Sequence, residues 1–476
     1  MVISKEDCKV LLLGTNTYTI GLRWDMVGEG KMKFQSPKGT RDLGPEEMII
    51  RDYVIQTIKR VFESYGFEAL ETPALEDLDL LTAKSGKDIV KQIFRIESEG
   101  KKKLGLRFDL TVPLARFLVN NPQLPKPFKR YAIAPVWRYE EPQAGRLRQF
   151  YQADVDICGP SSMEADVECI ACAIDCLKAL GLEKLKVRIN NRKLLEAFVE
   201  IVKEKIPEEV EIEFGNLEVF RILDKLSKIG VSGVKEELKK IGMPKKQIDE
   251  LLEIASIRGK YEEVLKKGEA LVKDNPKGRE GIEELKQIFE FSKLYGIAEL
   301  LILDFGLARG LDYYTGPIFE IEMEGEKIGS LAGGGRYDNL IELYGGKPTP
   351  ATGISLGVER IIEIMKRKKI VELPKTRIKV FVANVSKEVR AEVIRVAGIL
   401  RNEGIPTQTD LMNRSLTKQL EYADSLGIPF VLIVGMKELQ TKKFKLRDMR
   451  KKIEKELEIE EIVELLKNYN SGFANF

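Results

Sequence analysis

Histidine is absent from this chain of 476 residues. Its absence excludes His general bases, His-containing catalytic triads and metal sites with His ligands. Chemistry that needs charge must come from other side chains, and charged residues make up 32% of the sequence. The formal net charge is only +3, so any contact with nucleic acid must come from a local basic patch rather than from the charge of the whole chain.

Long apolar runs are also missing. No run of about 18 apolar residues is present, so the sequence predicts no membrane span. The stretch at 9–13, in which four apolar residues follow Lys9, is too short for the core of a signal peptide. Because the five cysteines are odd in number and no secretory leader precedes them, we expect a reducing compartment, the cytoplasm.

Three of the cysteines share one predicted helix face. Cys169, Cys172 and Cys176 have the spacing of a helical stripe. With Cys158 as a fourth ligand they could hold a metal ion or cluster, but free cysteine commonly packs as a small hydrophobic side chain. We therefore expect core packing, and no metal ion held by Cys or His.

Glycine-rich phosphate loops are absent as well. The sequence has neither a G-x-x-x-x-G-K-[ST] motif nor a G-x-G-x-x-G motif after a strand. A phosphate group would have to be bound by side chains. Arginine suits this role because its planar guanidinium binds phosphate oxygens bidentately and stays charged.

The most distinctive stretch that is present lies at 303–341. Alternation over 318–323 predicts a strand, and a second strand at 328–332 would run into three consecutive glycines, Gly333 to Gly335. Glycines in such a place indicate close approach of the backbone to another group, or a positive φ. The stretch is interpreted either as a tight hairpin with solvated arginines or as a pocket wall for a small polar ligand with an anionic group. The pocket-wall interpretation rests on Arg309, Tyr313, Tyr314, Arg336 and Tyr337.

Residues 309–316 and 332–341 closely resemble the two histidine-binding signatures of the histidyl-tRNA synthetase family, in its archaeal-like form. The strands expected at 131–140 and 148–156, joined by a basic loop, resemble motif 2 of class II synthetases. A helix at 46–65 followed by a strand at 67–71 resembles motif 1, which builds the dimer interface in that family. Residues 351–362 resemble motif 3. The resemblance covers about residues 32 to 468.

The resemblance implies an α+β multidomain fold. A class II catalytic core with an antiparallel sheet would comprise residues 32–191 and 296–372. A helical insertion at 192–295, which in the family is thought to clasp the tRNA acceptor arm, would interrupt it. Residues 375–476, in which strands alternate with helices, would form an α/β anticodon-binding domain, and residues 1–31 an N-terminal extension of unknown role.

For ATP, the resemblance implies a site built on arginine. Arg138 would grip the α-phosphate and, with Arg309, act in catalysis, while Mg²⁺ would accompany the nucleotide. Glu140 would contact adenine and Phe150 would stack on it. Arg360 would hold the γ-phosphate and cover the adenine, and Arg146 would lie near the outer phosphates.

For histidine, the resemblance implies a second set of residues. Asp109 and Thr111, two apart on an expected strand, would point to the same face and hold the ammonium group, unless that edge is merely solvated. Asp156 and Tyr314 would read the two imidazole nitrogens with one acceptor and one donor, although many family members carry Glu where this chain has Asp156. The remaining residues of this pocket would be Gln152, Arg309, Tyr313 and Tyr337. Gln143 would contact the tRNA.

The implied function is that of a histidine–tRNA ligase, which activates L-histidine with ATP and transfers it to the 3′ end of tRNA(His), as a homodimer without membrane contact. A related alternative is a regulatory subunit of ATP phosphoribosyltransferase, but such subunits typically lack the C-terminal domain and have degraded signatures. A catalytically silent RNA-binding protein or scaffold should have lost Arg138, Arg309 or Arg360. All three arginines are present.

Overall fold

The computed structural model describes residues 34–83, 87–97, 102–142, 147–207, 214–309, 313–326 and 328–469. The expected extension at 1–31 lies outside these ranges. The chain divides into a short N-terminal segment, Met1–Pro37, and a compact body, Lys38–Phe476. The described helices and strands all belong to the body. In the ranges given, no helix is long and apolar enough to cross a membrane.

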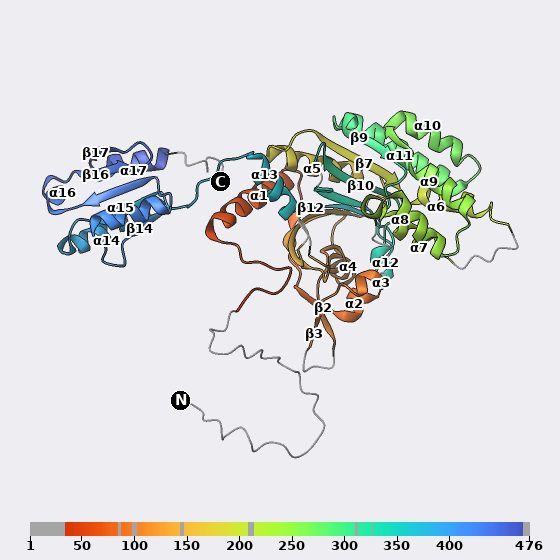
Figure 1. Cartoon of the computed structure of the whole chain (residues 1–476), viewed down its shortest axis with the longest axis horizontal. Coiled ribbons are helices and arrows are strands. Elements are labelled where there is room, and N and C mark those ends of the chain that lie inside the picture. Colours follow the sequence, from red (N-terminus) through yellow and green to blue (C-terminus); the bar gives the residue numbers. More distant parts are fainter. Residues whose placement is uncertain are drawn as a thin grey trace, which may run out of the picture. The chain divides into compact units, whose positions relative to one another are not determined.

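A nine-stranded sheet forms the centre of the part of the chain that precedes residue 375 (Figure 1). Six consecutive strands, from β5 to β7 in spatial order, pair antiparallel, while β1 and β9 add parallel to the two ends of that set and β8 pairs antiparallel with β9. The strands in spatial order are β1 (Glu68–Ala69), β5 (Phe128–Trp137), β6 (Gln149–Cys158), β12 (Ala351–Gly357), β11 (Ala332–Arg336), β10 (Pro317–Met323), β7 (Leu185–Asn191), β9 (Leu301–Asp304) and β8 (Arg258–Lys260).

The predicted antiparallel pair of motif 2 is confirmed as β5 and β6. The second strand of the glycine hairpin differs from the expectation, because β11 begins at Ala332 and contains the three glycines. Glycine has a low strand propensity, but here the glycines lie between β10 and β12, and packing against neighbouring strands overrides propensity. Ideal Cβ atoms on Gly334 and Gly335 would collide with the backbone oxygens of Gly353 and Pro317.

The helices that pack on this sheet include α1 (Pro45–Ser64), α5 (Glu164–Ala179) and α13 (Val358–Lys368), which follows β12 directly. Helix α11 (Pro276–Leu294) packs on α5 and contacts β7 and β10. The cysteine stripe confirms the core-packing prediction, since Cys169, Cys172 and Cys176 on α5 are fully buried free thiols in the hydrophobic core.

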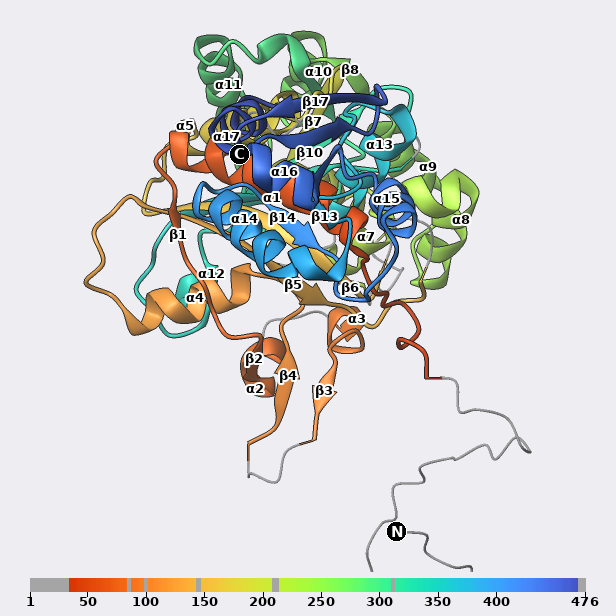
Figure 2. The same ribbon diagram turned by 90° about the vertical axis from the view of Figure 1, so that its left-hand side faces the viewer.

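A small three-stranded sheet, β2 (Leu75–Asp77), β4 (Leu104–Leu106) and β3 (Arg95–Ile96), stands apart from the large one (Figure 2). Beside it lie α2 (Leu78–Thr82) and α3 (Lys87–Val90). The prediction that Asp109 and Thr111 share a strand is wrong, because β4 ends at Leu106 and α4 (Thr111–Asn120) begins at Thr111. The carboxylate of Asp109 accepts the N–H of Val112 at 3.1 Å, which satisfies one of the backbone donors left without a partner in the first turn of a helix. Pro113 is tolerated in that first turn.

The described residues between 192 and 295 are mainly helical, and the helices are separated as the punctuation by glycine and proline predicts. Gly230, with a φ of 68°, interrupts α8, and the side chain of Asn275 caps α11 by accepting the N–H of Gly278. The region also supplies β8 to the large sheet, which the sequence did not indicate. The helices of this region are α6 (Arg192–Lys203), α7 (Asn216–Leu223), α8 (Leu226–Lys240), α9 (Lys245–Ala255), α10 (Tyr261–Leu271) and α11 (Pro276–Leu294). Two further helices lie outside it, namely η2 (Ala298–Leu300) before β9 and α12 (Leu340–Leu343) after β11.

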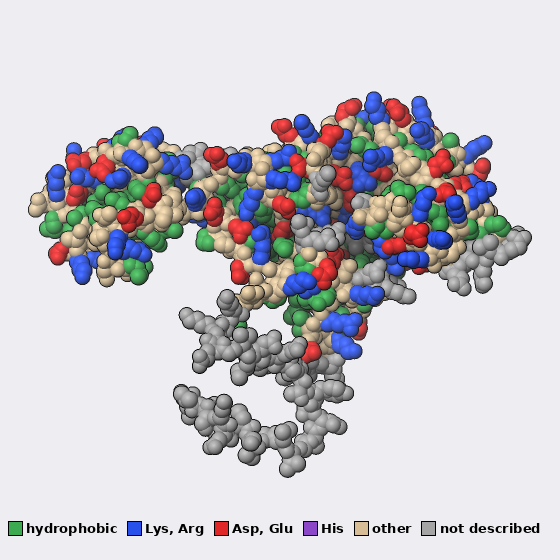
Figure 3. Space-filling view, in the orientation of Figure 1, with side chains coloured by type: hydrophobic (Ala, Val, Ile, Leu, Met, Phe, Trp, Pro, Cys, Tyr) green, Lys and Arg blue, Asp and Glu red, His purple; other side chains and the backbone are tan. Residues whose placement is uncertain are grey.

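The C-terminal part is an α/β unit with its own five-stranded sheet in the order β14-β13-β15-β16-β17. β14, β13 and β15 are parallel, and separate hydrophobic clusters lie on the two faces. The elements are β13 (Val380–Asn384), η3 (Lys387–Val389), α14 (Arg390–Asn402), β14 (Thr407–Thr409), α15 (Leu416–Ser425), β15 (Phe430–Val434), α16 (Met436–Thr441), β16 (Phe444–Asp448), β17 (Ile453–Leu457) and α17 (Ile459–Asn468). On the face of the whole molecule that Figure 3 shows, basic and acidic side chains are interspersed.

The domain boundaries given in the sequence analysis stay predictions.

Candidate active site

One large cavity, of about 1420 Å³, lies on the open face of the nine-stranded sheet. It brings together residues of β6, β7, β10, β11 and β12 and of the loops that follow β4, β5 and β9. Every described residue predicted for the ATP or histidine site lines it, whereas Gln143 and Arg146 lie outside the described residues. The lining includes Asp109, Thr111, Arg138, Glu140, Phe150, Gln152, Asp156, Arg309, Tyr313, Tyr314, Tyr337 and Arg360.

Strand alternation explains the floor of the cavity. On β6, Gln152, Asp154 and Asp156 face the cavity, while the residues between them, Ala153 and Val155, belong to the hydrophobic core. Side chains on a strand point alternately to the two faces, so one strand supplies both the core and three polar groups of the site.

Arg138 is held at the cavity wall by neutral acceptors. Its Nε donates to the backbone oxygen of Phe108 at 2.9 Å and its Nη2 to the side-chain oxygen of Gln152 at 3.2 Å. The guanidinium also lies over the ring of Phe150, with 5.2 Å between its Cζ and the ring centroid. Since none of these partners is charged, the positive charge of Arg138 is available to an anionic ligand.

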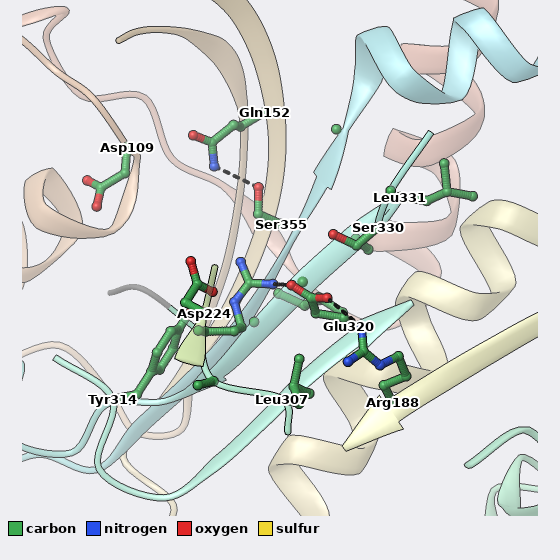
Figure 4. A pocket seen from close by; sticks show the side chains of 18 of the residues that line it. Asp109, Gln152, Arg188, Asp224, Leu307, Tyr314, Glu320, Ser330, Leu331 and Ser355 are labelled. Atoms are coloured by element: carbon green, nitrogen blue, oxygen red, sulfur yellow. Dashed lines mark hydrogen bonds and ion pairs between the residues drawn. The ribbon is translucent and has the colours of Figure 1, made fainter. Parts of the chain in front are cut away.

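Gln152 is itself fixed from the other side. Its amide nitrogen donates to the hydroxyl of Ser355 at 2.7 Å and to the carboxylate of Asp154 at 3.3 Å (Figure 4). This leaves the amide oxygen turned toward Arg138. At the far wall, Nη1 of Arg360 donates to the backbone oxygen of Ser330 at 2.7 Å.

Three buried carboxylates, those of Asp109, Asp154 and Asp156, line the same cavity. Asp156 forms an ion pair with the buried Arg130, at 2.7 Å between Oδ2 and Nη2, and accepts a hydrogen bond from the hydroxyl of Tyr337. Burial raises the pKa of Asp154 to about 7 and that of Asp109 to about 6. Oδ2 of Asp109 is buried and has no hydrogen-bond partner among the described residues, so the cavity contains an acceptor suited to a substrate ammonium.

The tyrosines form a second cluster. The hydroxyl oxygen of Tyr314 accepts a hydrogen bond from Arg309, and the hydroxyls of Tyr313 and Thr111 are hydrogen-bonded to each other. The ring of Tyr313 makes edge contacts with those of Tyr314 and Tyr337, with centroids 5.0 and 5.7 Å apart. Burial disfavours the charge of Arg309, but Tyr314 and Glu320 outweigh it and raise its pKa.

Arg336 does not belong to the pocket wall, contrary to the prediction from its sequence neighbourhood. It is buried on the other side of the sheet, where it pairs with Asp166 of α5 and donates to the backbone oxygens of Pro160 and Ser162. The site also contains residues that the sequence did not indicate, namely Arg130, Asp154, Arg188 and Glu320. Of these, Asp154 could have been found, because it shares the alternation of Gln152 and Asp156.

Residues 39–361 match the family model of histidyl-tRNA synthetase, and residues 379–469 match that of an anticodon binding domain. The chain belongs to the histidyl-tRNA synthetase family. It thus has the class II synthetase fold that the signatures and the three motifs predicted.

Curated relatives agree over nearly the whole chain. The histidine–tRNA ligase of Pyrococcus furiosus is 39% identical over 90% of this chain and 98% of its own length. That of Aeropyrum pernix is 42% identical over 85% of this chain and 91% of its own. Among solved structures, histidyl-tRNA synthetase from Nostoc sp. PCC 7120 is 32% identical, with a TM-score of 0.76, covering 92% of this chain and 99% of that one.

Proposed function

We propose that this protein is a histidine–tRNA ligase, which joins L-histidine to AMP and then to the 3′ end of tRNA(His). The observation that carries the proposal is the placement of Arg138 and Arg309 on the same cavity as the buried carboxylates Asp109 and Asp156. An amino acid has a positive end and a negative end, and ATP is an anion. A cavity with both kinds of group can align the two.

Activation requires attack of the histidine carboxylate on the α-phosphate of ATP, which forms histidyl-adenylate while the bond to the β-phosphate breaks and pyrophosphate leaves. The nucleophile is already anionic, so no general base is needed, which fits a chain without histidine. Asp109 binds the ammonium group through its unpaired oxygen, while Arg138 and Arg309 stabilise the charge that develops at phosphorus. Alignment of the carboxylate and the phosphate supplies the other part of the rate acceleration. The ATP site is completed by Glu140, Phe150 and Arg360, which all line this cavity. In this proposal Glu140 contacts the adenine, Phe150 stacks on it and Arg360 binds the γ-phosphate.

Recognition of the imidazole falls to Tyr314 and Asp156. Because Tyr314 accepts a hydrogen bond from Arg309, its own O–H can donate to one ring nitrogen. Asp156, held by Arg130 and Tyr337, can accept from the N–H of the other. A donor and an acceptor fixed in this way select a neutral ring with a single N–H.

Magnesium enters this proposal with ATP. In the described ranges no group of three or more Cys, Asp or Glu side chains is arranged to hold a metal ion, and Mg²⁺ at such sites is bound largely by substrate phosphates. When bound, it neutralises phosphate charge. The tRNA would be bound by the C-terminal unit and the helical insertion, with Gln143 among its contacts and Arg146 near the ATP phosphates.

The assembly and compartment are proposed on separate grounds. We assign a homodimer because α1 and β1 correspond to motif 1, and light scattering of the purified protein would measure the mass.

The cytoplasm fits the four described cysteines, which are all free thiols. The alternative of a regulatory subunit is not favoured, because the curated ligases match nearly the full length of the chain.

The deciding experiment is ATP–pyrophosphate exchange with each standard amino acid in parallel. We expect exchange with histidine and with no other amino acid, followed by histidine transfer to tRNA(His). Absence of exchange with every amino acid would contradict the proposal. Exchange with a different amino acid would overturn the assignment of Asp156 and Tyr314.

A further inference from the structure

A row of side chains crosses the cavity floor from strand to strand. The strand registers place Arg188 (β7) opposite Glu320 (β10), Glu320 opposite Gly333 (β11), Gly333 opposite Ser355 (β12), and Ser355 opposite Asp154 (β6). Figure 4 shows Glu320 joined to Arg188, and Ser355 joined to Gln152. The activation step described above uses neither Glu320 nor Arg188.

Gly333 is the gap in this row, and Arg309 fills it. A Cβ atom on Gly333 would collide with Nη1 of Arg309. The guanidinium of Arg309 therefore lies directly on the sheet, at the one position of this row that has no side chain. There its Nη1 donates to Oε1 of Glu320 at 3.0 Å.

Glu320 stands between two guanidinium groups. Its Oε1 binds Arg309, while its Oε2 lies 3.7 Å from Nη1 of Arg188. Arg188 is anchored in turn by Asp304 and Glu322, each at 3.0 Å. The side chains of Glu320 and Arg309 are each only 20% exposed, so the pair is screened less by water than a surface ion pair.

We propose that Glu320 is a positioning residue, which fixes the guanidinium of Arg309 over Gly333 so that it meets the α-phosphate in one geometry. The inference rests on the proposed function of Arg309. Guanidinium groups only donate hydrogen bonds and a carboxylate only accepts them, so Glu320 accepts a hydrogen bond from Arg309 and at the same time forms a longer ion pair with Arg188. No other side chain on this row bridges Arg309 to a strand in the described part of the chain.

The test is Glu320→Gln in histidine-dependent ATP–pyrophosphate exchange. The side-chain amide of glutamine has only one accepting atom. Its nitrogen would therefore face one of the two guanidinium groups, and two hydrogen-bond donors would oppose each other there. We expect kcat to fall roughly 10- to 100-fold, the loss typical of a misplaced catalytic group, while the KM values for ATP and histidine change less than about threefold. The matched control is Glu322→Gln, which removes a carboxylate from the same strand that contacts Arg188 but not Arg309, and it should keep the wild-type kcat.

A double-variant cycle separates positioning from a general structural role. In an Arg309→Ala background, Glu320→Gln should have no further effect, because the group that it positions is gone. An equal loss in both backgrounds would overturn the proposal, and so would a kcat for Glu320→Gln equal to that of Glu322→Gln. If Glu320→Gln does not fold, Glu320→Asp serves instead, and a wild-type kcat for this shorter carboxylate would also overturn it. Absence of exchange in the wild-type protein would instead contradict the proposed function itself.

Discussion

Individual residues of this site show a conflict between folding and binding, and Asp109 shows it most clearly. It is buried, one of its oxygens has no hydrogen-bond partner among the described residues, and burial raises its pKa to about 6. Arg138 and Arg130 lower that pKa and Asp156 raises it. A carboxylate in such surroundings destabilises the folded protein when it is charged, yet it is the charged form that binds an ammonium group.

Asp109→Asn should therefore stabilise the protein at neutral pH. Between about pH 4 and pH 6 the folded state binds more protons at Asp109 than the unfolded state, so the stability of the wild type falls as pH rises through this window. Relative to the wild type, the variant should gain about 1–3 kcal/mol at pH 7 and little at pH 4. Urea unfolding at both pH values measures the difference. Equal stabilities at pH 7 would contradict the raised pKa.

The same residue illustrates what sequence reasoning can reach. The resemblance predicted Asp109 for the histidine pocket, and it lines the cavity, but the expected strand is wrong because local alternation gave no sign of its contact with the N–H of Val112. Residues inside a motif, such as Arg138 and Tyr314, were assigned through the resemblance to the family, and both line the cavity. Arg188 and Glu320 were missed because their roles depend on which strands pair across the sheet, and register between distant strands is a tertiary property.

Among the elements, β11 departs most from its local sequence. Three glycines form a strand in the middle of a sheet, because β10, β12 and Arg309 occupy the space that side chains would need. Amphipathic helices followed the sequence pattern closely, since α1 (Pro45–Ser64) differs by one residue at each end from the helix expected at 46–65. The predicted limits of a strand were wrong where close packing, rather than intrinsic propensity, determines which residues form it, as in β11.

Gly333→Ala tests this interpretation of the strand. The added methyl group would displace the guanidinium of Arg309 rather than the backbone, so we expect the fold to persist and histidine-dependent exchange to fall roughly 100-fold. The control is Gly398→Ala in α14, where no described heavy atom lies within 4 Å of the new Cβ. It should keep full activity and gain up to about 1 kcal/mol of stability. Wild-type exchange by Gly333→Ala would show that Arg309 does not need this gap.

At the scale of the whole molecule, the hydrophobic cores separate along the chain. The largest cluster contains buried residues between Ile50 and Met365, while the two clusters of the C-terminal unit contain residues between Val380 and Leu466. A cut between Leu373 and Lys375 divides none of them. Every residue that lines the activation cavity precedes that cut, so amino-acid activation and binding by the C-terminal unit should be separable.

A chain ending at Pro374 should therefore retain histidine-dependent ATP–pyrophosphate exchange within about threefold of the full-length rate. Its kcat/KM for charging tRNA(His) should fall at least about 100-fold, because a second binding module on the same ligand raises its effective concentration by such factors. Circular dichroism would establish that the shortened chain is folded. Loss of exchange in a folded variant would mean that the cavity depends on the C-terminal unit, whereas undiminished charging would remove that unit from tRNA binding.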